Sequence, residues 1–363
     1  MKMHKLWTAA CALLTGNTRI ARWTHLHRRS WLPVASGLLA VLCVSVAVAV
    51  ARNQRTNSQQ PQEPPPYWAY PINPPAKASH ARRSPVDNAP LHVPGSRAAF
   101  TRRQINDGFS PPDWHPDGHP PMPEIVAHGR RPQVAACGYC HLPNGQGRPE
   151  NASLAGLPED YITRQIADFK SGRRKCSKPG FLPAEAMITH ETEATPQEIQ
   201  TAATYFSKLK PKPWIHVVET ATVPKTHVAG WMLVPTAGAG REPIGERIIE
   251  TPVNLELTEM RDDASGFIAY VPVGSIEKGR VLVTTGGAGT TIQCAICHGP
   301  DLKGLGNVPS IAGRSPSYIV RQLYDIQSGA RNGVDTQLMK PVVARLTLDD
   351  IISIAAYLAS LHP

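Results

Sequence analysis

The hydrophobic positions of this chain follow several different patterns. Residues 31–50 form a continuous apolar run without a charge, long enough to cross a hydrocarbon core as one helix. Near the C-terminus the apolar positions recur at three- and four-residue intervals, which predicts a helix with one buried face: Ile351, Ile354, Ala355 and Leu358. Three short runs are rich in β-branched residues and predict strands: 217–223, 228–234 and 266–273. We expect a mainly α-helical protein with a small β portion.

Two stretches, 124–212 and 278–363, repeat one pattern. Positions from Cys137 to Arg174 match those from Cys294 to Arg331 without a gap, and a five-residue insertion in the first copy follows. The last helix of each copy is predicted to begin at a capping box, at Thr195 and Thr347 respectively. Ser315-Pro316 predicts another helix start. An internal match of this length predicts two copies of one fold.

The remaining segments differ in composition. Residues 52–123 are rich in proline, which predicts an extended tether more than a packed domain. They also contain Tyr67, Trp68, Tyr70 and Trp114, which a spacer does not need, so part of this arm is expected to occupy a groove on the folded domains. Residues 213–277 form a partly β connector between the repeats.

Residues 1–51 predict the location of the protein. Basic residues and no acidic ones precede the apolar run, so the N-terminus should stay in the cytoplasm and the rest should cross the membrane. The length of the run favours a retained transmembrane anchor. Cleavage of a signal peptide near Ala49 or Ala51 is the alternative. We expect the repeated domains in the periplasm, either held at a bacterial inner membrane or soluble after cleavage.

The formal net charge of +10 adds little to this picture. Much of it belongs to the segment before the apolar run. No basic block with interleaved aromatic residues is present, so nucleic-acid binding is excluded.

Two C-x-x-C-H pentapeptides carry the chemistry. They are Cys137-Gly138-Tyr139-Cys140-His141 and Cys294-Ala295-Ile296-Cys297-His298. This motif attaches heme c, because two thiols one helical turn apart reach the vinyl groups at one porphyrin edge and the histidine then faces the iron. A disulfide or a zinc site is the alternative, but zinc needs four ligands and each motif offers three. Two covalently attached heme c groups are therefore expected, with His141 and His298 as iron ligands.

Each iron needs a sixth ligand or an open position. Met187 and Met339 occupy equivalent places in the two repeats, before the last helix, and a thioether ligand raises the reduction potential. The insertion in the first copy makes Cys176 or His190 an alternative ligand for the first iron. The plainer interpretation of Cys176 is a thiol without a role at the heme.

Two further groups of residues could bind something. The segment 113–119 contains Asp113, His115, Asp117 and His119, and with His128 nearby it resembles a metal cluster in composition. Basic residues of the second repeat could form a rim around its heme and steer an acidic redox partner: Lys303, Arg314, Arg321, Arg331 and Lys340. Ordinary solvated charge is the alternative.

These motifs resemble the diheme cytochrome c4 and c553 family. The resemblance rests on the heme motifs, on the series Gly156, Tyr161, Gln165 and Gly172, and on Met339-Lys340-Pro341 before the last helix. It implies two tandem class I cytochrome c domains, covalent heme at both motifs, methionine ligation at Met187 and Met339, and periplasmic electron transfer. The long connector and the proline-rich arm depart from the family pattern and suggest docking to a particular partner.

The expected function is one-electron transfer in a periplasmic or membrane respiratory chain. The chain would act as a carrier, or as a subunit through which electrons enter a larger complex, with a membrane dehydrogenase or a terminal oxidase as partner. No catalytic residues are expected. The alternative is a diheme enzyme of peroxidase or thiosulfate-oxidising type with an unusual first heme, for which Cys176 and His190 are the hints.

Overall fold

A computed structural model describes residues 64–75, 88–189 and 191–363 of the chain. These described residues belong to one compact unit. The whole of the predicted basic segment and anchor at 1–51, residues 52–63 and 76–87 of the arm, and His190 lie outside the described residues. Among the residues described, no helix is both long and apolar enough to span a membrane.

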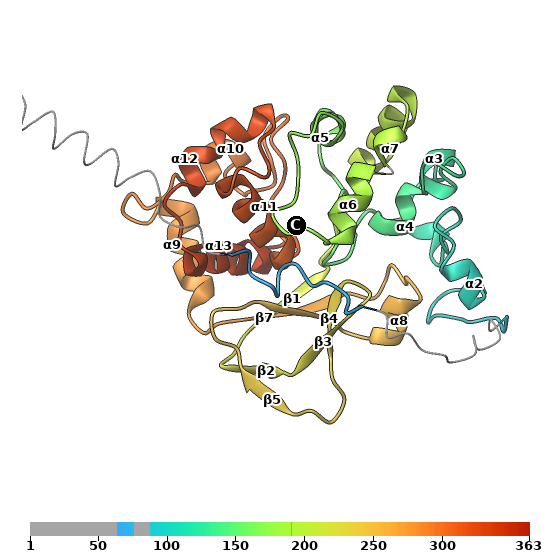
Figure 1. Cartoon of the computed structure of the whole chain (residues 1–363), viewed down its shortest axis with the longest axis horizontal. Coiled ribbons are helices and arrows are strands. Elements are labelled where there is room, and N and C mark those ends of the chain that lie inside the picture. The colour runs from blue at the N-terminus through green and yellow to red at the C-terminus, as the bar shows by residue number, and fades with distance from the viewer. Residues whose placement is uncertain (1–63, 76–87, 190) are drawn as a thin grey trace, which may run out of the picture. The chain divides into compact units, whose positions relative to one another are not determined.

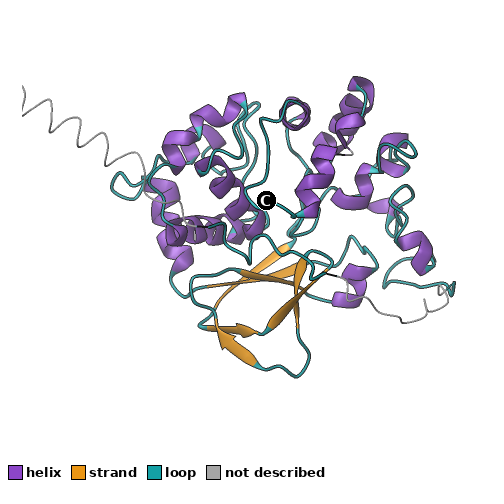
Figure 2. Ribbon diagram, in the orientation of Figure 1, coloured by secondary structure: helices purple, strands orange, loops and turns teal. Residues whose placement is uncertain are grey.

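The described part is mixed, with helices at both ends of the sequence and strands between them (Figures 1 and 2). The arm and first repeat contain α2 (Arg102–Ile105), η1 (Pro116–Gly118), α3 (Glu124–Ala127), α4 (Cys137–His141), α5 (Glu159–Lys170), α6 (Leu182–Thr189), η2 (Glu191–Glu193) and α7 (Pro196–Lys208). The second repeat and the residues just before it contain α9 (Ser275–Thr285), α10 (Ala295–His298), α11 (Pro316–Gln327), η3 (Val334–Leu338), α12 (Lys340–Val343) and α13 (Leu348–Ser360).

The predicted helix starts are present in the structure. The hydroxyl groups of Thr195 and Thr347 each accept a hydrogen bond from the backbone N–H three residues on. The carboxylates of Glu198 and Asp350 in turn accept one from the N–H of the capping threonine. Ser315 caps α11, with proline at its first position. These polar side chains satisfy backbone N–H groups that a helix start leaves without partners.

The helices of the second repeat surround a continuous apolar core. α13 packs against α9 and α11, and it buries Ile351, Ile354, Ala355 and Leu358 as the spacing predicted. Gly279 allows the close approach of α9, because a Cβ atom there would collide with the Ser353 carbonyl. In the first repeat α5 packs against α7 around a smaller core.

The connector supplies every regular strand of the described residues. They are β1 (Ile215–Glu219), β2 (Thr222–Pro224), β3 (Thr226–Ala229), β4 (Met232–Pro235), β5 (Arg241–Pro243), β6 (Ile249–Pro252) and β7 (Phe267–Val271), with α8 (Leu255–Glu259) between the last two. β7 is central in a three-stranded sheet, parallel to β1 and antiparallel to β6. β3 pairs with β4 and β2 with β5, both antiparallel.

The connector contacts both repeats. Asn144 Nδ2 of the first repeat donates to the Asp263 carbonyl at 2.6 Å. Ser315 Oγ of the second donates to Glu250 Oε2 at 2.7 Å. The connector is thus hydrogen-bonded to each of the two repeats.

The proline-rich arm requires a correction. The expectation of an extended tether over 52–123 is wrong for its described part, because Trp68 and Tyr70 are buried in the core that includes the second repeat, and Trp114 is 1% exposed. Trp114 belongs to a separate cluster with Val93, Ile105 and Met260. Proline removes backbone donors, but the aromatic side chains between the prolines bury enough apolar area to hold the segment in place. The expectation that part of the arm lies in a groove is confirmed.

Candidate functional site

The first C-x-x-C-H motif forms the short helix α4. His141 is 8% exposed, and its Nδ1 donates to the Ala152 carbonyl at 2.8 Å. This bond fixes the ring orientation and leaves Nε2 as the nitrogen with a lone pair. Burial lowers the pKa of His141, so the ring stays neutral, as metal ligation requires.

The second motif repeats this geometry in α10. His298 Nδ1 donates to the Pro309 carbonyl at 2.8 Å, and Pro309 is the repeat equivalent of Ala152. Burial likewise lowers the pKa of His298. Two histidines held by the same backbone bond at equivalent positions indicate one chemical role in both repeats.

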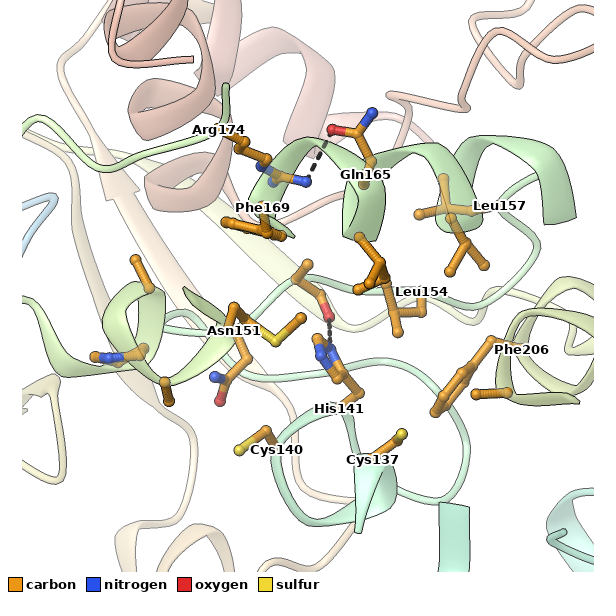
Figure 3. Close-up of a pocket in the computed structure, with 18 of the residues that line it drawn as sticks. Cys137, Cys140, His141, Asn151, Leu154, Leu157, Gln165, Phe169, Arg174 and Phe206 are labelled. Atoms are coloured by element: carbon orange, nitrogen blue, oxygen red, sulfur yellow. Dashed lines mark hydrogen bonds between the residues drawn. The ribbon is translucent and has the colours of Figure 1, made fainter. Parts of the chain in front are cut away.

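A large, mainly apolar cavity opens above α4 (Figure 3). Its lining brings together the two motif cysteines, the histidine and residues of three further helices: Cys137, Cys140, His141, Leu154, Leu157, Ile162, Phe169, Met187, Ala202 and Phe206. Figure 3 shows the His141 ring rising from α4, with Phe206 on one side of the cavity. The Phe206 ring lies 6.1 Å from the His141 ring between centroids.

The two candidate methionines differ in their surroundings. Met187 lies in α6 and lines the same cavity as His141. Met339 lies between η3 and α12, where it is partly buried against the second repeat's core. The structure thus brings Met187 to the first motif. Its role and that of Met339 as iron ligands remain predictions.

Cys176 also lines the first cavity. Burial, followed by the charge of Asp325, raises the pKa of this thiol to about 11. A bound metal ion itself deprotonates a thiol, so this shift does not distinguish the plainer interpretation from ligation by Cys176, and both stay predictions.

The two repeats meet through a symmetric polar network. Arg174 donates to Gln165 Oε1 in its own repeat, and to Tyr318 and Gln322 across the interface at 3.2 and 3.1 Å. Arg331, its repeat equivalent, donates to Gln322 Oε1 and, across the interface, to Tyr161 and Gln165 at 3.0 and 2.8 Å. The backbones of the two arginines form an antiparallel bridge. A pseudo-twofold axis therefore relates the repeats at this point.

Parts of this network lack partners. Gln165 Nε2 and Arg331 Nε are buried without a hydrogen bond, although Gln165, Arg174, Tyr318 and Gln322 line the cavity above α4. Buried donors without acceptors are costly. The Gln165 amide and the Arg174 guanidinium line an apolar cavity and suit the carboxylates of a porphyrin, so these residues fit heme.

The predicted basic rim is wrong for three of its members. Arg314, Arg321 and Arg331 are 6%, 3% and 8% exposed. Arg314 donates across the interface to the Ser153 and Ala155 carbonyls, and Arg321 donates to the Ala69 carbonyl at 2.7 Å. The guanidinium groups of Arg314 and Arg321 therefore connect the second repeat to the first repeat and to the arm. Lys303 and Lys340 remain exposed.

The metal cluster predicted within 113–119 divides into two pairs. His115 Nε2 lies 2.9 Å from Asp262 Oδ1 of the connector, and His119 Nε2 lies 3.2 Å from Asp113 Oδ1. Asp117 and His128 are exposed. The partners of His115 come from a distant segment that sequence spacing could not identify.

Sequence reasoning also missed a buried ion pair at the first site. Glu150 is 5% exposed and lines the cavity, and Arg148 Nη2 lies 2.5 Å from Glu150 Oε1. The second repeat has Leu305 and Asn307 at these positions. The different residues at equivalent positions of the two repeats were the sequence feature that could have pointed to this ion pair.

Several known proteins are similar to this chain in sequence. No protein-family model matches the chain. The thiosulfate dehydrogenase electron acceptor of Stutzerimonas stutzeri is 35% identical over 235 residues, which are 64% of this chain and 82% of that protein. The protein of the same name from Thiomonas intermedia is 29% identical over 234 residues, 63% of this chain and 80% of its own length. Cytochrome c4 of Azotobacter vinelandii is 25% identical over 241 residues, 63% of this chain and 86% of its own length.

A solved structure of thiosulfate dehydrogenase from Marichromatium purpuratum is 26% identical, with a TM-score of 0.43. It matches 65% of this chain and 39% of that one.

The chain belongs to the family of diheme c-type cytochromes that contains cytochrome c4 and the thiosulfate dehydrogenase electron acceptors. Its cofactors are two covalently attached heme c groups. Its matched relatives are electron-transfer proteins and not catalysts, which confirms the expectation of a redox protein over an enzyme.

Proposed function

We propose that this chain accepts electrons from a periplasmic dehydrogenase and passes them, one at a time, through two hemes joined at the pseudo-twofold interface. The observation that carries this proposal is the reciprocal network of Arg174 and Arg331. It places the two heme modules side by side with shared polar contacts. Heme supplies the reversible one-electron couple, and the protein sets its potential and position.

The residue roles follow the repeat. Cys137 and Cys140 would hold the first heme and Cys294 and Cys297 the second, with His141 and His298 facing the irons. Met187 and Met339 would complete the coordination. The interface arginines, tyrosines and glutamines would be available to hold heme carboxylates.

The partner is proposed from the relatives. Two of them are named as electron acceptors of thiosulfate dehydrogenase, so an enzyme of that class is the first donor to test. A terminal oxidase or another membrane dehydrogenase is the further partner. We place the heme modules in the periplasm, held at a bacterial inner membrane by the apolar run 31–50, or free if that segment is cleaved.

The test of the heme assignment is a potentiometric titration of the holoprotein and of Met187→Ala and Met339→Ala. Wild type should show two one-electron steps and the ferric absorption band at about 695 nm that marks methionine ligation. Each variant should lower the reduction potential of one heme and reduce the intensity of this band by half. Met122→Ala is the matched control. Variants with unchanged steps would refute methionine ligation.

The test of the donor is rapid mixing of oxidised holoprotein with thiosulfate and a thiosulfate dehydrogenase. Heme reduction should require both. Reduction by sulfite dehydrogenase with sulfite, and not by this pair, would refute the donor while leaving the carrier role intact.

A further inference from the structure

His115, Asp262 and Asp263 meet at a place where the arm, the connector and the first repeat come together. His115 precedes η1, and the two aspartates lie between α8 and β7. Trp114 Nε1 donates to the Met260 carbonyl at 2.8 Å, which fixes the arm to the connector. Asn144, three residues after His141, donates to the Asp263 carbonyl and fixes the connector to the first repeat.

Three possible metal-ligand atoms converge here. One nitrogen of His115 and one carboxylate oxygen each of Asp262 and Asp263 all lie within 4.8 Å of one another. Two of them, His115 Nε2 and Asp262 Oδ1, are 2.9 Å apart. Two ligands at roughly 2.0–2.2 Å from one ion lie at most about 4.4 Å apart, so a small movement of these side chains would let the three atoms share an ion. The segments that carry these three residues are already held in place by the hydrogen bonds of Trp114 and Asn144.

The two aspartates are buried side by side. Asp262 is 4% exposed and Asp263 is 7% exposed. Asp262 Oδ1 already accepts from His115 and from the Ala264 backbone, whereas Asp263 Oδ1 is buried without any hydrogen-bond partner. A buried carboxylate oxygen with no donor is costly, and a second carboxylate beside it adds repulsion. A cation bound by both carboxylates would remove both costs.

The nearby His119 is not part of the candidate ligand set. Its Nε2 faces Asp113 Oδ1, and its Nδ1 lies 2.8 Å from the Pro120 carbonyl and 3.1 Å from the Tyr205 hydroxyl. Because the Asp113 and Pro120 oxygens are acceptors, both ring nitrogens of His119 donate a proton, and neither has a lone pair for a metal ion. The candidate ligand set is therefore one imidazole and two carboxylates.

We propose that His115, Asp262 and Asp263, with a water molecule as the fourth ligand, bind one divalent transition-metal ion, with zinc as the expected occupant. An imidazole favours zinc and related metals over calcium and magnesium, which prefer oxygen ligands alone. Zinc has no redox chemistry, so it would not compete with the hemes for electrons. The ion would hold the arm against the connector and the first repeat.

The test uses the holoprotein after treatment with a chelator and dialysis. Zinc is added as its chloride, and binding is measured by isothermal titration calorimetry and by metal analysis after gel filtration. Wild type should retain one zinc ion in addition to its two iron atoms. Added zinc should raise its melting temperature, because the folded state alone contains the site.

Two variants remove single ligands. His115→Ala and Asp263→Asn should each weaken zinc binding at least about tenfold, since even residues that only support a metal ligand contribute this much. His128→Ala and Asp117→Asn change exposed residues of the same types nearby and should bind as wild type does. An unchanged heme spectrum in each variant shows that the first module is still folded.

Two results would overturn the proposal. One is wild type that retains no zinc. The other is equal binding by wild type, His115→Ala and Asp263→Asn, which would place the zinc elsewhere. The outcome is independent of the proposed electron donor, because no step of the assay requires electron transfer.

Discussion

Glu150 is a buried charge beside the proposed position of the first heme. It lines the cavity that contains His141, and its one ionic partner in the described residues is Arg148. A negative charge near an iron favours the ferric state and lowers the reduction potential, especially where burial weakens screening. Asn307 occupies the equivalent position in the second repeat. Glu150 should therefore lower the reduction potential of the first heme and not that of the second.

Glu150→Gln should therefore raise the potential of the first heme. We expect a rise on the order of 60 mV, which corresponds to a tenfold change for a one-electron couple. A potentiometric titration measures both steps, and the second should not move. Glu124→Gln changes an exposed carboxylate and serves as the control. A shift of both steps by equal amounts would count against a local effect.

Cys176 should react slowly with thiol reagents. Its pKa of about 11, raised by burial, leaves little thiolate at pH 8. Mass spectrometry of the holoprotein after timed treatment with iodoacetamide should find this peptide largely unmodified until the protein is denatured. Cys176→Ser should leave both heme spectra unchanged. A changed first-heme spectrum would mean that the thiol contacts the iron.

At the scale of elements, the connector and the second repeat meet at the start of α11. Glu250 of β6 accepts from Ser315 Oγ and from the Ser317 backbone N–H, while its Oε1 is buried without a partner. Burial outweighs these hydrogen bonds and raises the pKa of Glu250 above its ordinary value. The folded state therefore favours the neutral carboxyl, although the two hydrogen bonds by themselves favour the ionised one.

This shift makes the stability of the protein depend on pH. The folded protein keeps a proton on Glu250 over a range where the unfolded chain has lost it. The stabilisation is complete below the unfolded pKa and is lost as the pH rises through the folded pKa. Glu250→Gln, neutral throughout, should thus gain in free energy of unfolding relative to wild type as the pH rises above about 4.5.

Guanidinium unfolding of both proteins at several pH values measures this difference. Glu246→Gln, an exposed position on the same connector, should follow the wild-type curve. A Glu250→Gln curve parallel to that of wild type would contradict the proposed cost of ionisation.

At the scale of the whole molecule, the arm is part of the core. Tyr70 is 1% exposed. Its hydroxyl donates to Asp325 Oδ1 at 2.8 Å, and its ring meets Phe181 of the first repeat and Tyr324 of the second, both edge-on. One side chain of the arm thus contacts both heme modules. This placement explains why a proline-rich segment carries aromatic residues.

Tyr70→Ala should destabilise the protein strongly. Loss of a buried aromatic ring costs about 3–5 kcal/mol. Tyr67→Ala removes a ring that is 64% exposed and should cost less than about 1 kcal/mol. Thermal unfolding of the two holoproteins compares them directly. Equal effects would show that the arm is not anchored by Tyr70.

The sequence by itself determined the features that depend on local spacing. The two C-x-x-C-H motifs, the repeat and the capping residues Thr195, Ser315 and Thr347 could be recognised because each acts through neighbours a few residues away. The short β-branched runs also predicted strands where β1 to β4 and β7 lie, but they missed β5 and β6. These features identify the class of protein without any knowledge of its packing.

Only the tertiary structure decided which distant residues meet. Arg314, Arg321 and Arg331 have the composition of a surface rim, yet they lie buried because carbonyl and side-chain oxygens of the arm and the first repeat accept their hydrogen bonds. Proline content predicted a free tether, but Tyr70 and Trp114 find apolar partners far along the chain. The physical reason is that burial and charge compensation depend on neighbours in space, which local sequence patterns do not specify.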